Sequence, residues 1–124
     1  MNLPSEIRHY IEAYNAMDVA GMLDCLSEDV VFRNYSGDTL TAQAGNKSEF
    51  AELAEFGVKA FRSRIQAVTH VVSVADITAV EISYDAVVAM DLPNGWKAGQ
   101  KVRFTGASLF QVSGGRITAI TDQS

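Results

Sequence analysis

The sequence has one cysteine, two histidines and two prolines among its 124 residues, and it has no cluster of Lys or Arg. The single cysteine, Cys25, excludes a disulfide within the chain, and His9 and His70 are too few and too isolated to suggest a zinc site. A net charge of −5 without a basic stretch argues against a nucleic-acid partner. No window reaches the roughly 18 to 20 apolar residues of a membrane span, and the N-terminus does not combine a charged start with an apolar run. We therefore expect a cytoplasmic protein with no metal, no nucleic acid and no membrane partner.

What the chain does have is apolar residues, which make up 48% of the sequence. A chain of this length and composition can bury one core and remove about two-thirds of its unfolded surface from water. No repeat or low-complexity segment divides it. We expect a single domain over residues 1–124.

Three helices are predicted in the first half of the chain from apolar residues at spacings of three and four. The first begins near Pro4 or Ser5, and its apolar stripe consists of Ile7, Tyr10, Ile11, Tyr14 and Met17. Asp18 is placed to cap a short second helix. Asn46, followed by Glu49 three residues later, resembles a capping box and predicts a third helix that ends near residue 62.

Strands are predicted after the third helix, because the hydrophobic period changes from about 3.6 to 2. Apolar and polar residues alternate from Val80 to Met90, and the outer face of this strand becomes apolar after Asp85. Strands also fit residues 29–35, 62–74, 99–112 and 116–123, whereas none is predicted in the polar segment 36–46. Asn-Gly at Asn94 and Gly-Gly at Gly114 predict hairpin turns. We expect the four strands after the third helix to pair antiparallel in a curved sheet that the helices cover on one face, which makes an α+β domain with a concave, apolar mouth.

This order of elements resembles the nuclear-transport-factor-2-like superfamily, and within it the SnoaL-like and ketosteroid-isomerase-like proteins. The segments that carry the resemblance are "YNAMDVAGMLDCLSEDVVF" at residues 14–32 and "GGRITAITD" at residues 114–122, and it extends over nearly the whole chain. The resemblance implies a cone-shaped half-barrel, in which a curved antiparallel sheet wraps around three N-terminal helices and encloses a hydrophobic cavity. It also implies a homodimer formed through the sheet, and no cofactor. The superfamily includes isomerases, polyketide cyclases, epoxide hydrolases and dehydratases as well as binding modules, so the fold alone does not choose an activity.

The resemblance to ketosteroid isomerase is partial at the positions that carry its chemistry. Its first-helix tyrosine, which donates a hydrogen bond to an oxyanion, matches Tyr10. Its aspartate base matches Asn34, and its neutral carboxylic acid on the penultimate strand matches Ser108. Both carboxyl groups are therefore missing, which disfavours the isomerase reaction of that relative.

Asp122 is the remaining carboxylate that we expect inside the cavity, because it shares a strand face with Ile120 and the superfamily points that face inward. Burial among Phe104, Phe110 and Ile120 would raise its pKa and suit it to acid–base catalysis. The alternative is a solvated residue near the C-terminus, or one paired with Arg33 or Arg116. We take Asp122 and Tyr10 as the candidate catalytic residues.

The candidate ligand-binding residues are all expected to face inward, from the first helix, the third helix or a strand. They are Asn34, Tyr14, Phe50, Phe104, Ser108, Phe110 and Ile120. Each has a structural alternative. Asn34 could bond its own backbone in a turn, Tyr14 could be core packing, and Ser108 could simply be small. Trp96 could cover the cavity or cap its own turn.

Two functions are consistent with these residues. The first is an enzyme that acts on a small hydrophobic carbonyl, hydroxyl or epoxide compound, with Asp122 as the acid–base group and Tyr10 and Asn34 as orienting groups. The alternative is a non-catalytic module that binds a hydrophobic ligand in the same cavity. An apolar outer sheet face, such as Val87 with Leu109, would serve a homodimer in either case.

Overall fold

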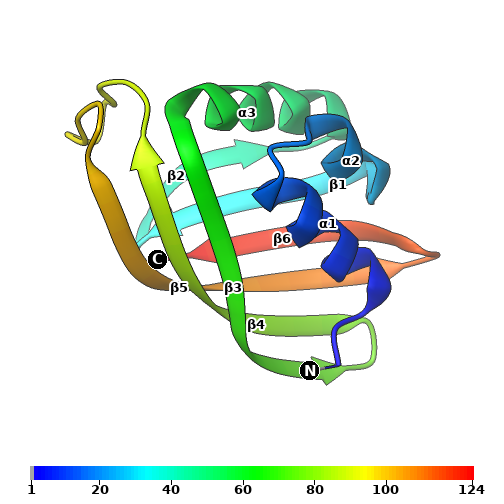
Figure 1. The fold of residues 1–124 in the computed structure, drawn as a ribbon. Helices are drawn as coiled ribbons and strands as arrows, with labels where there is room; N and C mark the ends of the chain where they lie inside the picture. The colour runs from blue at the N-terminus through cyan, green and yellow to red at the C-terminus, as the bar shows by residue number, and fades with distance from the viewer. Residues whose placement is uncertain (1) are drawn as a thin grey trace.

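A computed structural model describes residues 2–124 and shows three helices and one six-stranded sheet (Figure 1). The helices are α1 (Ser5–Asn15), α2 (Val19–Asp24) and α3 (Lys47–Ala60). The strands are β1 (Leu26–Ser36), β2 (Thr39–Ala44), β3 (Phe61–Val74), β4 (Ile77–Val88), β5 (Lys101–Ser113) and β6 (Arg116–Gln123). The predicted α+β class is confirmed.

The predicted caps of the second and third helices are present. The Asp18 carboxylate accepts a hydrogen bond from the Gly21 amide at 3.0 Å, and the Asn46 side chain accepts one from the Glu49 amide at 2.8 Å. The Glu49 carboxylate in turn accepts from the amide of Gly45, the residue before the cap, at 2.7 Å. Helix α3 ends at Ala60, slightly earlier than predicted, because Phe61 is already extended as the first residue of β3.

The strands lie in the order β2-β1-β6-β5-β4-β3. The four strands after α3 pair antiparallel as predicted, but β1 and β6 pair in parallel, so the sheet is mixed. Strand β2 was not predicted. Its six residues, TLTAQA, do alternate between polar and apolar, but two of the apolar members are only alanines and the third, Leu40, is exposed, so its pairing with β1 at the sheet edge is what identifies it as a strand.

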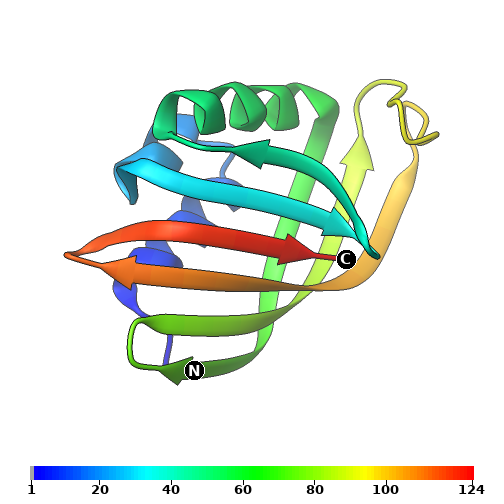
Figure 2. The same cartoon turned by 180° about the vertical axis from the view of Figure 1, so that it is seen from behind.

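All three helices lie on the concave side of the sheet, as the two opposite views show (Figures 1 and 2). The main core fills the space between α1, α2, α3 and the sheet, and its most buried members include Ile7, Met22, Leu26, Val30, Phe110, Ile117 and Ile120. A second cluster lies further along β4 and β5, around Tyr84, Ala86, Val88 and Val102. Between the two clusters β4 and β5 bend (Figure 1).

Strand β5 bends together with its partner β4 near the point where β5 begins to pair with β6 (Figure 1). Gly106 lies at this point, opposite Ile82, one residue before the first β5–β6 pair. A Cβ atom at Gly106 would lie 2.8 Å from the backbone oxygen of Gln123, which is closer than such atoms approach each other. The C-terminal end of β6 therefore depends on the missing side chain at Gly106.

We expect Gly106→Ala to lower the free energy of unfolding by about 1–3 kcal/mol, since the added methyl group must displace backbone rather than a flexible side chain. Urea unfolding followed by circular dichroism measures the change. Thr105→Ala, at the exposed neighbouring position of the same strand, is the matched control and should change stability by less than about 0.5 kcal/mol. Equal stability of Gly106→Ala and the wild type would contradict the close approach.

Candidate active site

A pocket of about 640 Å³ opens at the end of the cone where the C-terminus lies. Its walls come from α1, from β1 and β2, from β3 and β4, from the loop between β4 and β5, and from β5 and β6. The pocket lies beside the bend at Gly106, which is one of its lining residues. Elements from both ends of the chain therefore meet around one cavity.

A row of three polar residues crosses the sheet at one wall of this pocket. The strand register places Asn34 of β1 beside Asp122 of β6, and Asp122 beside Ser108 of β5. The Ser108 hydroxyl donates a hydrogen bond of 2.6 Å to Oδ1 of Asp122. All three residues line the pocket, so three positions singled out from the sequence lie together.

Asp122 is partly buried at the pocket wall, and the loss of water around its carboxyl group raises its pKa to about 6, against the opposing effect of the hydrogen bond from Ser108. The residue is held in the sheet rather than solvated at a loose end. The Ser124 amide donates to the carbonyl of Tyr35, and the Gln123 side chain donates to the carbonyl of Gly37. No ion pair within residues 2–124 involves Asp122, so neither Arg33 nor Arg116 is its partner.

Asn34 is tied to the edge strand. Its amide nitrogen donates to Oγ1 of Thr41 at 2.7 Å, and the Thr41 hydroxyl donates to the Asn34 carbonyl at 3.1 Å. The side-chain oxygen of Asn34 has no hydrogen bond to residues 2–124, and it remains available as an acceptor at the pocket wall.

A pair of tyrosines forms a second polar group in the pocket. The hydroxyl groups of Tyr14 on α1 and Tyr84 on β4 lie 3.0 Å apart. The Tyr84 ring stacks on Phe104 with centroids 4.7 Å apart, and Phe61 and Trp96 surround the stack. Tyr14 and Phe104 were predicted as ligand-binding residues, and Trp96, which was expected either to cover the cavity or to cap its own turn, is found at the pocket wall. Tyr84 and Phe61 were not predicted. A signal for Tyr84 was present, because its hydroxyl lies on the inward, otherwise apolar face of the alternating strand.

The other predicted site residues lie in the main core and not among the residues that line the pocket: Tyr10, Phe50, Phe110 and Ile120. Tyr10 packs against the rings of Phe50 and Phe110 with centroid distances of 6.3 and 5.9 Å. Burial, followed by the charge of Asp122, raises the pKa of Tyr10, so its hydroxyl stays protonated. Tyr10 therefore lies near enough to Asp122 for the two groups to interact electrostatically.

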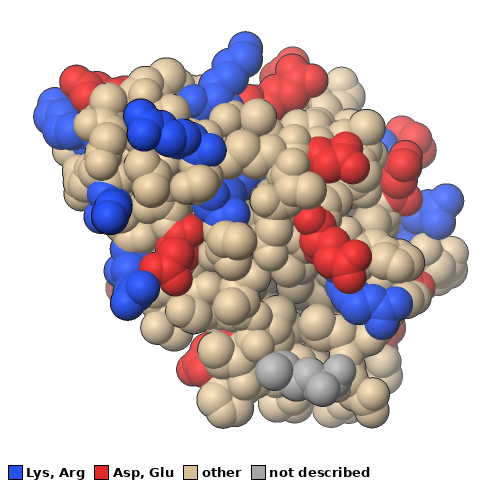
Figure 3. Space-filling view, in the orientation of Figure 1, with Lys and Arg blue, Asp and Glu red and all other residues tan. Residues whose placement is uncertain are grey.

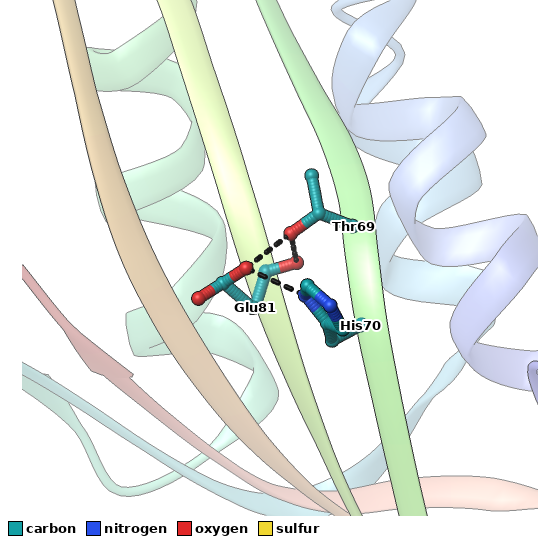
Figure 4. Close-up of polar contacts among 3 residues, drawn as sticks. All are labelled: Thr69, His70 and Glu81. Atoms are coloured by element: carbon teal, nitrogen blue, oxygen red, sulfur yellow. Dashed lines mark hydrogen bonds and ion pairs between the residues drawn. The ribbon is translucent and has the colours of Figure 1, made fainter.

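His70 belongs to a separate group on the outer face of the sheet (Figure 4). Its Nδ1 atom lies 2.7 Å from Glu81, which also accepts a hydrogen bond from Thr69 at 2.7 Å. These contacts, that of Thr69 first, lower the pKa of Glu81. The group is exposed at a β-bulge between Val68 and His70, and it does not reach the pocket.

Charged side chains of both signs are interspersed over the face shown in Figure 3. No group of three or more His, Cys, Asp and Glu side chains suited to a metal ion occurs within residues 2–124. Over the same range, no helix has the length and apolar character needed to cross a membrane.

The chain belongs to the SnoaL-like domain family, whose model matches residues 7–120. A search of curated proteins found no match. The family assignment agrees with the resemblance identified from the sequence.

Solved structures share the same fold. A protein from Catenulispora acidiphila with a ketosteroid-isomerase-like fold, solved with trimethylamine, has a TM-score of 0.81 at 12% identity, over 98% of this chain and 85% of that one. A protein from Pseudomonas putida KT2440, provisionally assigned as a polyketide cyclase, has a TM-score of 0.79 at 22% identity, over 98% and 90% of the two chains. A similarly assigned protein from Silicibacter sp. TM1040 has a TM-score of 0.75 at 25% identity, over 94% and 84%. These likenesses support the family and not a particular reaction.

We expect Ser108→Ala to raise the pKa of Asp122 above its wild-type value of about 6, because the lost hydrogen bond stabilises the ionised carboxylate. Carbon-13 NMR titration of the Asp122 carboxyl carbon measures this value directly. Thr105→Ala is the control. Thr105 lines the same pocket but is not hydrogen-bonded to Asp122, so this variant should leave the pKa of Asp122 unchanged. A lowered pKa in Ser108→Ala would show that the serine does not stabilise the charged form.

Proposed function

We propose that the protein is an enzyme that acts on a small hydrophobic compound with a carbonyl, hydroxyl or epoxide group, and that Asp122 is its acid–base residue. The observation that carries the proposal is a partly buried carboxyl group with a pKa of about 6, hydrogen-bonded by Ser108 at the wall of an aromatic-lined pocket. A group with such a pKa exchanges protons readily near neutral pH. Its position also differs from the two carboxyl positions of ketosteroid isomerase, which Asn34 and Ser108 occupy here.

The proposed step is a proton transfer between the ligand and Asp122. Oδ1 already accepts from Ser108, which leaves Oδ2 free to take a proton from a C–H beside a carbonyl, from a hydroxyl, or from a water that attacks an epoxide. The same oxygen then returns the proton to a different atom of the ligand. The free acceptor of Asn34 in the same row orients a ligand hydroxyl. Tyr10 lies in the core and interacts electrostatically with Asp122 from there.

A ligand can be found by a thermal-shift screen with polycyclic ketones, phenols, aromatic epoxides and fatty acids, with product analysis of each hit. A ligand at 100 times its dissociation constant adds about 2.7 kcal/mol to stability, which raises the melting temperature by several degrees. A compound that stabilises the protein and is recovered unchanged would favour the alternative function, a binding module for hydrophobic ligands.

For a compound that is converted, Asp122→Asn is expected to lower kcat by about 10²- to 10⁴-fold with little change in affinity. If Asp122 acts first as a base, wild-type activity should increase as the pH rises through about 6. Asparagine keeps an acceptor for Ser108, so the variant should fold. The raised pKa means that the folded state binds this proton more tightly than the unfolded chain does. The free energy of unfolding of the wild type should therefore decrease as the pH rises from about 4 to about 6, and that of Asp122→Asn should decrease less. Unchanged kcat in the variant would exclude the proposed role.

We also propose that the outer face of the sheet forms a homodimer. Large apolar side chains are exposed on β3 and β5: Ile65 at 53%, Val72 at 65%, Val74 at 71% and Leu109 at 44%. The register places Val72 beside Ala79 and Ala79 beside Leu109, so part of this patch is continuous across three strands. A continuous apolar patch on a sheet face is typical of a protein interface.

Leu109→Lys is expected to convert the dimer to a monomer, because it places a charge at the β5 end of the apolar row formed by Val72, Ala79 and Leu109. Sedimentation velocity measures the mass. Phe56→Lys is the control, since Phe56 is 51% exposed on α3, away from the sheet's outer face, and this variant should stay dimeric. A wild-type protein that sediments as a monomer would contradict the proposal.

A further inference from the structure

The hydroxyl pair of Tyr14 and Tyr84 has one proton more than its own hydrogen bond uses. Two hydroxyl groups carry two protons, and the bond between them, 3.0 Å long, takes up one. Neither hydroxyl has another hydrogen-bond partner within residues 2–124. Burial raises the pKa of Tyr84 far above its ordinary value, so the phenol stays protonated. The pair therefore has one O–H group to donate, and both residues line the pocket.

A buried positive charge lies behind this pair. Arg64 on β3 is only 4% exposed, and its guanidinium carbon lies 3.7 Å from the centre of the Tyr14 ring. Its Nε donates to the carbonyl of Tyr14 at the end of α1, at 3.3 Å, while its Nη2 is buried and has no hydrogen-bond partner within residues 2–124. No acidic side chain of that range forms an ion pair with it.

A buried guanidinium without a carboxylate partner favours negative charge in its surroundings. The carbonyl end of α1 and the face of the Tyr14 ring offset only part of its charge. Polarisation through Tyr14 also makes the hydroxyl pair a stronger hydrogen-bond donor. The two observations, a free donor and an unpaired cation behind it, both describe a place where an oxyanion is stabilised.

We propose that the hydroxyl groups of Tyr14 and Tyr84, backed by Arg64, form an oxyanion-binding site for a carbonyl, enolate or phenolate oxygen of the ligand. Tyr14 and Tyr84 would contact this oxygen, and Arg64 is a positioning residue that acts through Tyr14. The inference rests on the proposed function in that both sites act on one ligand. When Asp122 takes a proton from a C–H that is conjugated with a carbonyl group of the ligand, the electron pair of the broken bond moves through the conjugated system onto the carbonyl oxygen, which accepts the hydrogen bond of the tyrosine pair.

The two polar groups are well placed to act on one molecule. Tyr84 lies opposite Phe104 on β5, and Ser108, the partner of Asp122, lies four residues further along the same strand. The bend at Gly106 separates them, so both face the same concave space. Phe104 and Trp96 supply apolar surface for the ligand framework beside the tyrosine pair.

The test measures binding of 2-naphthol and of 2-methoxynaphthalene, its neutral methyl ether, to Asp122→Asn protein. This variant removes the proposed acid–base group and its negative charge, so the result does not depend on turnover. Ultraviolet absorbance at a series of pH values reports how readily the bound naphthol ionises. We expect the bound naphthol to ionise more readily than free naphthol.

Adding Tyr14→Phe and Tyr84→Phe together should weaken binding of the naphtholate by about 10- to 100-fold, because either hydroxyl alone can still donate and only the double change removes the hydrogen bond to the charged oxygen. Binding of the methyl ether should change by less than about threefold, which also shows that the pocket remains folded. Adding Arg64→Met should make the bound naphthol ionise less readily, and Arg64→Lys, which keeps the charge, should restore most of the effect. A merely structural role of Arg64 would change binding of both probes equally.

The proposal is overturned if the naphtholate binds no better than the methyl ether, if the double tyrosine change weakens both probes equally, or if neither probe binds at millimolar concentration. These failures differ from failure of the proposed function. Full turnover by Asp122→Asn would remove the role of Asp122 while the naphthol results still test the tyrosine pair.

Discussion

The position of β6 between β1 and β5 determines which side chains share the pocket. Because side chains alternate between the faces of a strand, a shift of one residue in β6 would turn Asp122 to the outer face. The parallel pairing with β1 and the antiparallel pairing with β5 fix the same register from both sides. The backbone bonds from Ser124 to Tyr35 and Gly37 hold the last residues in that register. A carboxyl group near the C-terminus is thereby held as firmly as one in the middle of a sheet.

Two groups of opposite charge lie in the fold without neutralising each other: Asp122 at the wall of the pocket and Arg64 buried behind Tyr14. Asp122 is bonded by a neutral hydroxyl, and Arg64 by a carbonyl and an aromatic ring. Direct contact between them would lower the pKa of Asp122 and use the donors of Arg64, and the carboxyl group would then be a permanent anion. Their separation costs stability, since each charge lacks a full partner. It leaves a proton acceptor in one part of the cavity and an anion-stabilising field in another.

The local parts of this fold could be predicted from the sequence, and the non-local parts could not. The caps at Asp18 and Asn46 and the turn at Gly114 and Gly115 depend on neighbouring residues, and all are present. The parallel β1–β6 pairing joins the two halves of the chain, and no local pattern specifies it. The turn between β3 and β4 has a positive φ of 54° at Ala75, and it could not be predicted because no glycine is present at that position. Both the parallel β1–β6 pairing and the turn at Ala75 depend on how strands pair across the sheet.

The same limit applies to the site. Asp122, Asn34 and Ser108 were each identified singly, but their contact follows from the register of three strands. Tyr84 and Phe61 were missed because their convergence depends on the curvature of β4 and β5, whereas Trp96 had been expected as a possible cover of the cavity. Arg64 was missed for a different reason, since arginine is rarely buried without a carboxylate, and composition alone predicts it on the surface.

The neighbours of Asp122 in the row of Asn34, Asp122 and Ser108 also affect how readily its carboxyl group gains and releases a proton. Neighbouring strands bring residues of one row to within about 5 Å. Carboxylates at two adjacent positions of the row would repel, and one would hold its proton. With an amide on one side and a hydroxyl on the other, the central carboxyl group has polar neighbours that do not compete for its proton. The row therefore lets a single carboxyl group on β6 gain and release a proton with no second carboxyl group beside it.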